Sequence, residues 1–160
     1  MSLTEQLARA AAAPKARVAA VYDSQETLKA MQKGLRNHFE FIGVRDAEAA
    51  IDKISAYQPD ILILSARGTS ISGFLMAHLL RVNRQFRVPA IALLYEEDNP
   101  EEQQQAERLG IKTVNWVPGD PEPILVMLRE VTSAPGFTRV RKRLDYREIL
   151  RREEPEEDEL

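Results

Sequence analysis

Short apolar runs alternate along this chain with segments in which apolar residues recur every three or four positions. The runs predict five strands, at residues 17–22, 39–44, 61–64, 88–95 and 113–117. The runs at 61–64 and 88–95 are almost continuously apolar, without the alternation of a strand that has one wet face. Continuous runs of this kind are typical of parallel strands that are covered on both faces.

The intervening segments predict helices, because their apolar residues repeat at helical spacing. These helices are expected at residues 26–39, 49–57, 74–83, 100–109 and from about 121 to 131. Leu75, Leu79 and Val82 share one face of the third helix. Local signals support the boundaries: Asp23, Ser24 and Asp46 are suited to N-caps, Pro100 to a helix start and Gly110 to a C-terminal cap.

Strands and helices that alternate in this way imply right-handed crossovers and a doubly wound sheet. We therefore expect a five-stranded parallel sheet in a three-layer αβα domain over residues 15–134, after an N-terminal extension of residues 1–14. Ligands and chemistry in such a sheet lie beyond the carboxyl ends of the strands. The residues expected at that edge are Tyr22, Asp23, Ser24, Ser65, Arg67, Leu94, Tyr95, Val117 and Pro118.

Several segments, taken in order, resemble the receiver (CheY-like) domain of two-component response regulators. The sequence Val-Tyr-Asp-Ser-Gln-Glu-Thr-Leu at 21–28 resembles the acidic turn after the first strand of that family. Pro-Asp-Ile-Leu-Ile-Leu-Ser at 59–65 resembles the phosphoacceptor strand, and Gly73 the glycine that opens the third helix. Residues 88–94 and 110–118 resemble the fourth strand and the stretch that ends in a Lys-Pro pair. The resemblance spans about residues 16–133 and implies the flavodoxin-like receiver fold.

The resemblance also implies what each site position would normally do. In receivers, two acidic residues and the acceptor carboxylate hold magnesium, while a hydroxyl and a lysine bind the phosphoryl oxygens. The corresponding residues here are Tyr22 and Asp23 (acidic pair), Ser65 (acceptor), Leu94 (hydroxyl), Val117 (lysine) and Val114 (an aromatic position in the fifth strand). Only Asp23 keeps the family's residue type, which predicts a degenerate pseudo-receiver without the phosphorylation residues.

The chemistry of these residues supports the same prediction. Magnesium is usually anchored by one or two carboxylates, and Asp23 beside Tyr22 is a poor anchor. Phosphoryl transfer depends on positioning and charge neutralisation, which Leu94 and Val117 cannot provide. We therefore expect no metal, no cofactor and no enzymatic activity.

Ser65 is the one residue at this edge that could act as a nucleophile, but the sequence places no evident base beside it. The two histidines, His38 and His78, fall in predicted helices and are expected to be structural. Glycine-rich phosphate loops and the Gly-x-Ser-x-Gly and His-Glu-x-x-His motifs are absent.

Asp23 can be interpreted in two ways. A carboxylate near a buried edge needs a partner, so Asp23 could pair with Arg67 and lock the loop, with Lys112 or Lys15 as less favoured partners. The alternative is that Asp23 caps the first helix.

The composition of the chain limits its possible cross-links, metal sites and cellular location. The chain has 160 residues, a net charge of −3 and no cysteine, so it can form neither a disulfide nor a thiolate metal site. No apolar run is long enough to span a membrane, and Glu5 and Arg9 interrupt the N-terminal segment, which argues against a signal peptide. The expected location is the cytoplasm.

Residues 135–160 are predicted to form a charged tail that follows a breaker at 132–136. Its first part is basic and its end is acidic, which predicts a basic helix followed by a disordered acidic segment. Three interpretations stay open: a solvated extension, a helix that binds a partner through residues such as Arg141, Leu144 and Arg147, and contact with nucleic acid or an anionic membrane. The acidic block argues against the third. The tail could also meet the acidic loop at 96–102, within one chain or across a dimer.

The function expected from these observations is a phosphorylation-independent interaction module in bacterial signalling, motility or polarity. By resemblance, other signalling or motility proteins, or a second copy in a homodimer, would bind at residues 101–108, 112–117 and 121–129. The candidate contact residues there are Glu101, Arg108, Lys112 and Arg129. A second hypothesis is that the apolar pocket around Tyr22, Leu94, Tyr95 and Val117 senses a small ligand. Enzymatic activity at Ser65 is the third.

Overall fold

A computed structural model describes residues 2–4, 15–45, 47–67, 72–82 and 88–137 of the chain. Its centre is a five-stranded sheet with strand order β2-β1-β3-β4-β5, in which every neighbouring pair is parallel. This is the doubly wound order in which strand order reverses between β1 and β3, so the expected fold class is confirmed.

The strands are short and match the predicted apolar runs closely. They are β1 (Arg17–Val21), β2 (Glu40–Val44), β3 (Ile61–Ser65), β4 (Ala90–Tyr95) and β5 (Lys112–Asn115). The last strand is shorter than the run at 113–117 that predicted it, and it forms one edge of the sheet. Val117 therefore lies beyond the strand, where it is 71% exposed.

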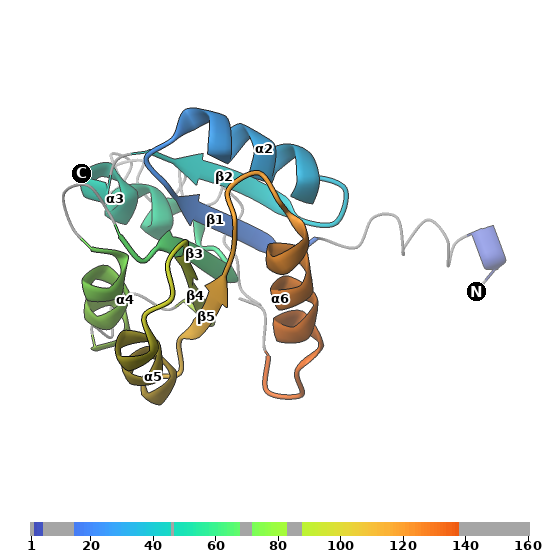
Figure 1. The fold of residues 1–160 in the computed structure, drawn as a ribbon. Coiled ribbons are helices and arrows are strands. Elements are labelled where there is room, and N and C mark those ends of the chain that lie inside the picture. The colour runs from blue at the N-terminus through green and yellow to red at the C-terminus, as the bar shows by residue number, and fades with distance from the viewer. Residues whose placement is uncertain (1, 5–14, 46, 68–71, 83–87, 138–160) are drawn as a thin grey trace, which may run out of the picture.

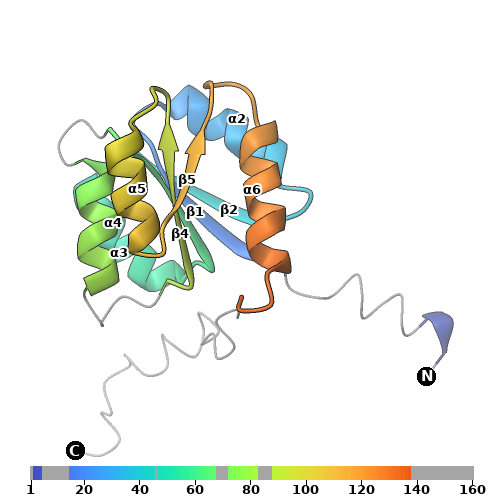
Figure 2. The same ribbon diagram turned by 60° about the horizontal axis from the view of Figure 1, so that its bottom comes forward.

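Helices cover both faces of the sheet (Figures 1 and 2). One face packs against α2 (Gln25–Leu35) and α6 (Glu122–Ser133), and the other against α3 (Ala47–Tyr57), α4 (Gly73–Val82) and α5 (Pro100–Arg108). Connections that run toward β5 use the second face and the connection from β1 back to β2 uses the first, as right-handed crossovers require.

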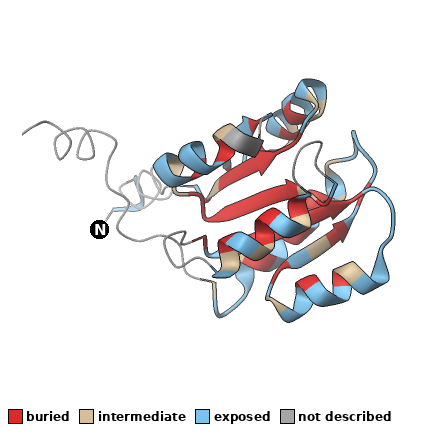
Figure 3. Ribbon diagram, turned by 90° about the vertical axis from the view of Figure 1, so that its left-hand side faces the viewer, coloured by how far each residue is buried: buried red, intermediate tan, exposed pale blue. Residues whose placement is uncertain are grey.

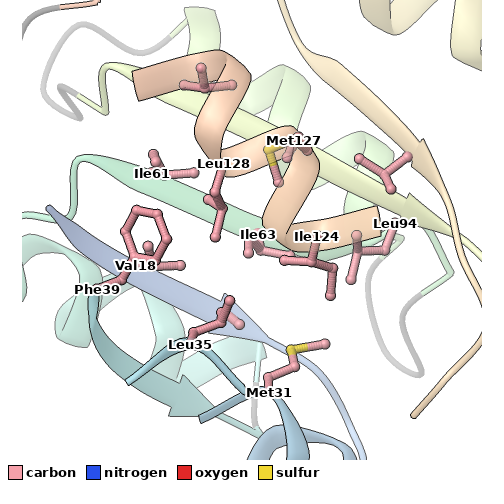
Figure 4. Close-up of a cluster of buried hydrophobic side chains, with 14 of the residues drawn as sticks. Val18, Met31, Leu35, Phe39, Ile61, Ile63, Leu94, Ile124, Met127 and Leu128 are labelled. Carbon is pink, nitrogen blue, oxygen red and sulfur yellow. The ribbon is translucent and has the colours of Figure 1, made fainter. Parts of the chain in front are cut away.

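The core consists of two buried clusters separated by the sheet. Figure 4 shows the first, which includes Met31 and Leu35 of α2, Ile124 and Leu128 of α6, and Ile63 of β3. The second lies under α3, α4 and α5. Every apolar residue of β3 and β4 except Ala90 is buried, whereas the outer faces of the helices are exposed (Figure 3). Full burial of each Leu or Ile contributes roughly 1.5–3 kcal/mol.

Local sequence signals begin and end the helices much as expected. Ser24 is the N-cap of α2, and its hydroxyl accepts a hydrogen bond from the Thr27 backbone N–H. Asn99 caps α5, which begins at Pro100, and Gly110 follows that helix with a φ of +74°, a left-handed conformation that favours glycine. The first helix ends at Leu35 rather than at Phe39, whose side chain is buried in the turn before β2.

A buried carboxylate ties the amino ends of the strands together. Asp60, immediately before β3, is fully buried and accepts a hydrogen bond from the Arg17 backbone N–H at 2.8 Å. Arg17 in turn donates to the Tyr57 carbonyl oxygen and forms an ion pair with Glu40 at 3.0 Å. The contact between Asp60 and Arg17 thus fixes the register of β3 against β1. The same strand, β3, ends at Ser65 on the opposite edge of the sheet.

The apolar face predicted on α4 exists, but it points outward. Leu75, Leu79 and Val82 are 48%, 53% and 60% exposed, while Met76 and Leu80 face the core. Asp46, the N-terminal segment at 5–14 and the charged tail from residue 138 lie outside the described residues.

Gly73 brings α4 against the end of β3. Its N–H donates to the Ala66 carbonyl oxygen, and a Cβ added at this position would overlap the carbonyl oxygen of Ser65. We expect Gly73→Ala to lower the free energy of unfolding by about 1–3 kcal/mol, because the backbone must shift to admit the methyl group. Urea denaturation measures the change. Gly136→Ala is the matched control, since nothing lies within 4 Å of a Cβ there. Equal stability of the two variants would contradict the prediction.

Candidate functional site

A pocket of about 160 Å³ lies at the carboxyl ends of β1, β3 and β4, where the fold predicts a site. Side chains from the ends of three strands, from the loop after β4 and from α5 line it. They are Tyr22, Asp23, Ser65, Ala66, Arg67, Leu94, Tyr95, Glu96, Glu97, Asn99 and Glu102.

Tyr22 stands at the position where receivers have their first acidic residue. Its side chain is buried, and its hydroxyl donates a hydrogen bond to Oε1 of Glu96. Its ring contacts Trp116 edge to face, with 5.8 Å between ring centroids. Burial raises the pKa of Tyr22 well above its ordinary value, and the Glu96 carboxylate raises it further. Tyr22 is therefore a neutral donor that ties the end of β1 to the loop after β4.

Tyr95 forms a second pair of the same kind. It ends β4, and its hydroxyl donates to Oε1 of Glu102 in α5 at 3.1 Å. The other oxygen of Glu102 accepts a hydrogen bond from the Asn99 side chain, which caps the same helix. Burial raises the pKa of Tyr95, and the Glu102 charge adds to this shift. Two tyrosine–glutamate pairs thus occupy the edge at which receivers bind a phosphoryl group.

Ser65 is half-buried at the acceptor position, and its hydroxyl donates to the carbonyl oxygen of Arg67 at 2.9 Å. Its proton is therefore directed to a backbone acceptor rather than to a basic side chain. Leu94 lies beside Ser65 in the register of β3 and β4, and it is 1% exposed. It fills the hydroxyl position with an apolar side chain of the core.

The pairing of Asp23 with Arg67 that the sequence suggested is wrong. Arg67 forms an ion pair with Glu97 at 3.2 Å, and Asp23 is exposed, so solvent satisfies its charge without a partner. The alternative role as N-cap is also wrong, since Ser24 caps α2. Lys15, one of the two less favoured partners, donates instead to the carbonyl oxygen of Arg36.

The electrostatics of the pocket oppose phosphate. Four carboxylates line it, those of Asp23, Glu96, Glu97 and Glu102, against the single guanidinium of Arg67. A phosphoryl group needs positive charge and donors on its oxygens, so this lining would repel it. Among the described residues, no group of three or more His, Cys, Asp or Glu side chains is arranged to hold a metal ion.

The structure assembles most, though not all, of the residues expected at this edge. Ser24 caps α2, while Val117 and Pro118 are exposed beyond β5 and do not line the pocket. The sequence analysis treated the loop at 96–102 as a contact for the tail and missed that Glu96, Glu97 and Glu102 line the pocket. Their position after the fourth strand was the available signal, because all parallel strands end at the same edge.

A second concavity of about 480 Å³ lies between β5 and α6, on the surface that the resemblance implied for partners. Val114, Pro123, Val126 and Met127 give it an apolar lining, and Lys112, one of the candidate contact residues, lies at its border. We call it the β5–α6 groove. Glu101, Arg108 and Arg129 are exposed on the flanking helices, while Arg141, Leu144 and Arg147 lie outside the described residues. Within the described ranges, no helix is long and apolar enough to cross a membrane.

The two tyrosine–glutamate pairs predict a pH dependence. A folded-state pKa above the ordinary value of 10.0 contributes stability that is complete below pH 10 and lost as pH rises beyond it. Each tyrosine should steepen the fall of the unfolding free energy with pH by up to about 1.4 kcal/mol per pH unit. Tyr22→Phe and Tyr95→Phe should therefore flatten the decline in unfolding free energy between pH 10 and pH 12, measured by urea titration. An unchanged slope in both variants would argue against these shifts.

Known proteins that resemble this chain were found by comparison of structures and not by comparison of sequences. No protein-family signature and no curated protein matches the sequence. Among solved structures, the chemotaxis protein CheY4 of Vibrio cholerae is 26% identical, with a TM-score of 0.64 over 73% of this chain and 98% of that chain. A response regulator from Desulfuromonas acetoxidans is 20% identical, with a TM-score of 0.63 over 73% and 96% of the two chains. A signal receiver domain from Bermanella marisrubri is 22% identical, with a TM-score of 0.61 over 74% and 99%.

The alignments cover nearly the whole of each of these three chains. The chain thus has the fold of response-regulator receiver domains.

Proposed function

We propose that this protein is a receiver-like module that binds a partner protein in bacterial signalling, motility or polarity without being phosphorylated. The observation that carries the proposal is the composition of the carboxyl-edge pocket. Its acceptor position is Ser65, its hydroxyl position is Leu94, and its lining carries four carboxylates against Arg67. Ser65 and Leu94 provide neither the acceptor carboxylate nor the hydroxyl that receivers use, which supports a role that does not depend on phosphorylation.

The same contacts favour a binding protein over an enzyme. The Ser65 hydroxyl donates to a backbone carbonyl oxygen, whereas an activated serine donates to a base. The polar groups of Tyr22 and Tyr95 are bound to glutamates of the same chain, which suits a structural role. Output from the module would then pass through its surface.

The β5–α6 groove is the surface that best suits a protein partner. Its volume of about 480 Å³ exceeds that of the carboxyl-edge pocket, and its apolar lining includes Val126, which is 43% exposed. Exposed apolar side chains rimmed by charges are common where proteins bind one another. Other signalling or motility proteins are the proposed partners, and a second copy of the chain would use the same surface in a homodimer.

The alternative function, sensing of a small ligand, has one observation in its favour. The carboxyl-edge pocket is open and partly apolar, with Leu94 and the two tyrosines in its lining. Its volume of about 160 Å³, however, is below the roughly 300–1,000 Å³ of most ligand pockets. Val117 also lies outside it. The protein-binding role is therefore the better supported of the two.

Treatment with a small phosphodonor and magnesium tests the central claim. We expect no stable phosphoryl adduct on the wild-type chain, and none on Ser65→Asp, because one carboxylate restores neither the lysine nor the hydroxyl that receivers use. Intact-mass spectrometry reads the result, and a receiver domain with a complete site, treated in parallel, shows that the donor is active. A covalent phosphoryl group on the wild-type chain would refute the proposal.

Charge placed in the groove tests the proposed surface. Val126→Glu should weaken partner binding at least about tenfold, because a buried interface core tolerates an unpaired carboxylate poorly. Ile51→Glu is the matched control: Ile51 is 42% exposed on α3, on the opposite face of the sheet. The measurement is affinity capture from the native cell extract, followed by titration of the captured partner. Equal binding by the two variants would place the partner surface elsewhere.

A further inference from the structure

The apolar surface of the β5–α6 groove that solvent reaches is formed by Val126, which is 43% exposed, and Pro123, and it lies beside an edge of β5 that no other described strand covers. β5 is the last strand in the sheet, and β4 pairs with one of its sides only. The Trp116 backbone N–H donates to the Tyr95 carbonyl oxygen, so the backbone groups of Asn115, one residue earlier, point away from β4. Natural proteins usually cover or protect such an edge.

The border of the groove is mainly acidic. Asp120, Glu122 and Glu130 contribute three carboxylates, and Lys112 is the single cation among the lining residues. All four are exposed. A segment that fits this surface would combine apolar side chains for Val126 and Pro123 with cations for the border.

The chain itself provides such a segment directly after the last described residue. Residues 138–147 contain five cations, Arg139, Arg141, Lys142, Arg143 and Arg147, and one carboxylate, Asp145. Val140 and Leu144 are the apolar residues between them. The acidic block starts later, at Glu153, so it need not approach the groove.

The described chain ends beside the buried cluster that backs the groove. α6 forms one wall of the groove and runs toward the amino end of the sheet, and the chain then turns back at Ala134–Phe137 (Figure 2). Phe137 packs against the same buried cluster as Val114 and Met127, two lining residues.

We propose that residues 138–147 fold back along the β5–α6 groove, with Val140 and Leu144 on its apolar lining and their neighbouring cations at its acidic border. Leu144 is seven residues beyond Phe137, a reach of up to about 23 Å. Val126 is seven residues above the end of α6, about 10 Å along the helix. The connection is therefore long enough to bring Leu144 to Val126.

The topology also defines how the segment binds. α6 covers the face used by α2, whose connection runs away from β5. A parallel sixth strand at the outer edge of β5 would consequently need a left-handed crossover, which is rare. The segment thus binds through side chains in the groove and does not extend the sheet as a parallel strand.

Competition between the tail and a partner protein is a consequence that rests on the proposed function. If partners bind the β5–α6 groove, residues 138–147 compete with them, and the tail sets their apparent affinity. The docking itself needs no partner, so it is measured on the chain alone and can fail or succeed independently of the proposed function.

Because the chain has no cysteine, one introduced pair gives an unambiguous cross-link. We would compare full-length Val126→Cys/Leu144→Cys with the matched control Ile51→Cys/Leu144→Cys, whose first site is equally exposed on the opposite face. At low protein concentration, the groove pair should form its intramolecular disulfide at least about tenfold faster than the control pair. Adding Glu122→Lys and Glu130→Lys, or raising the salt to about 0.5 M, should slow it toward the control.

Equal rates of disulfide formation for the two cysteine pairs would overturn the proposal. So would a rate for the groove pair that changes neither with salt nor with the two charge reversals. A disulfide that forms only between chains, with a rate that depends on protein concentration, would also overturn it and would assign the groove to a second copy. Non-reducing electrophoresis and intact mass distinguish these outcomes.

Discussion

The structure depends on the burial of β3 and β4 between two layers of helices. Ile61–Leu64 and Ile91–Leu94 are almost completely shielded from solvent, because α2 and α6 cover one face of the sheet and α3, α4 and α5 cover the other. A sheet covered in this way can present function only at the ends of its strands, at an open edge, or on the outer faces of its helices. The carboxyl-edge pocket lies at the ends of strands, and the β5–α6 groove lies at an open edge, as this constraint requires.

At the carboxyl edge, polar groups are bound to one another within the chain. The Tyr22 and Tyr95 hydroxyls donate to Glu96 and Glu102, and the Ser65 hydroxyl donates to a carbonyl oxygen. Buried polar groups that find partners inside the protein stabilise the fold and leave little capacity for a ligand. The edge that carries chemistry in receivers here joins the end of β1 to the loop after β4, and the end of β4 to α5. This arrangement is consistent with an activity that lies on the surface near β5.

Part of the site could be predicted from the sequence, and the errors have physical causes. Tyr22, Ser65 and Leu94 were placed correctly, because the end of a parallel strand fixes its last side chain in space. The proposed Asp23–Arg67 pair failed since it assumed burial, and Asp23 is exposed. The glutamates of the loop after β4 were missed because a loop has no periodicity from which the direction of its side chains can be inferred.

The sequence by itself determined the element order, the parallel sheet and the residue types at its carboxyl edge, because periodicity and residue chemistry are local properties. Only the tertiary structure decided which face of an apolar helix is buried. Leu75, Leu79 and Val82 have the spacing of a core stripe, yet α4 packs through Met76, Ala77 and Leu80. A helix that is apolar nearly all round has a weak preference of its own, so contact with the sheet sets its rotation. The tertiary structure likewise created the β5–α6 groove, because no pattern in the sequence of either wall predicts that the two lie side by side.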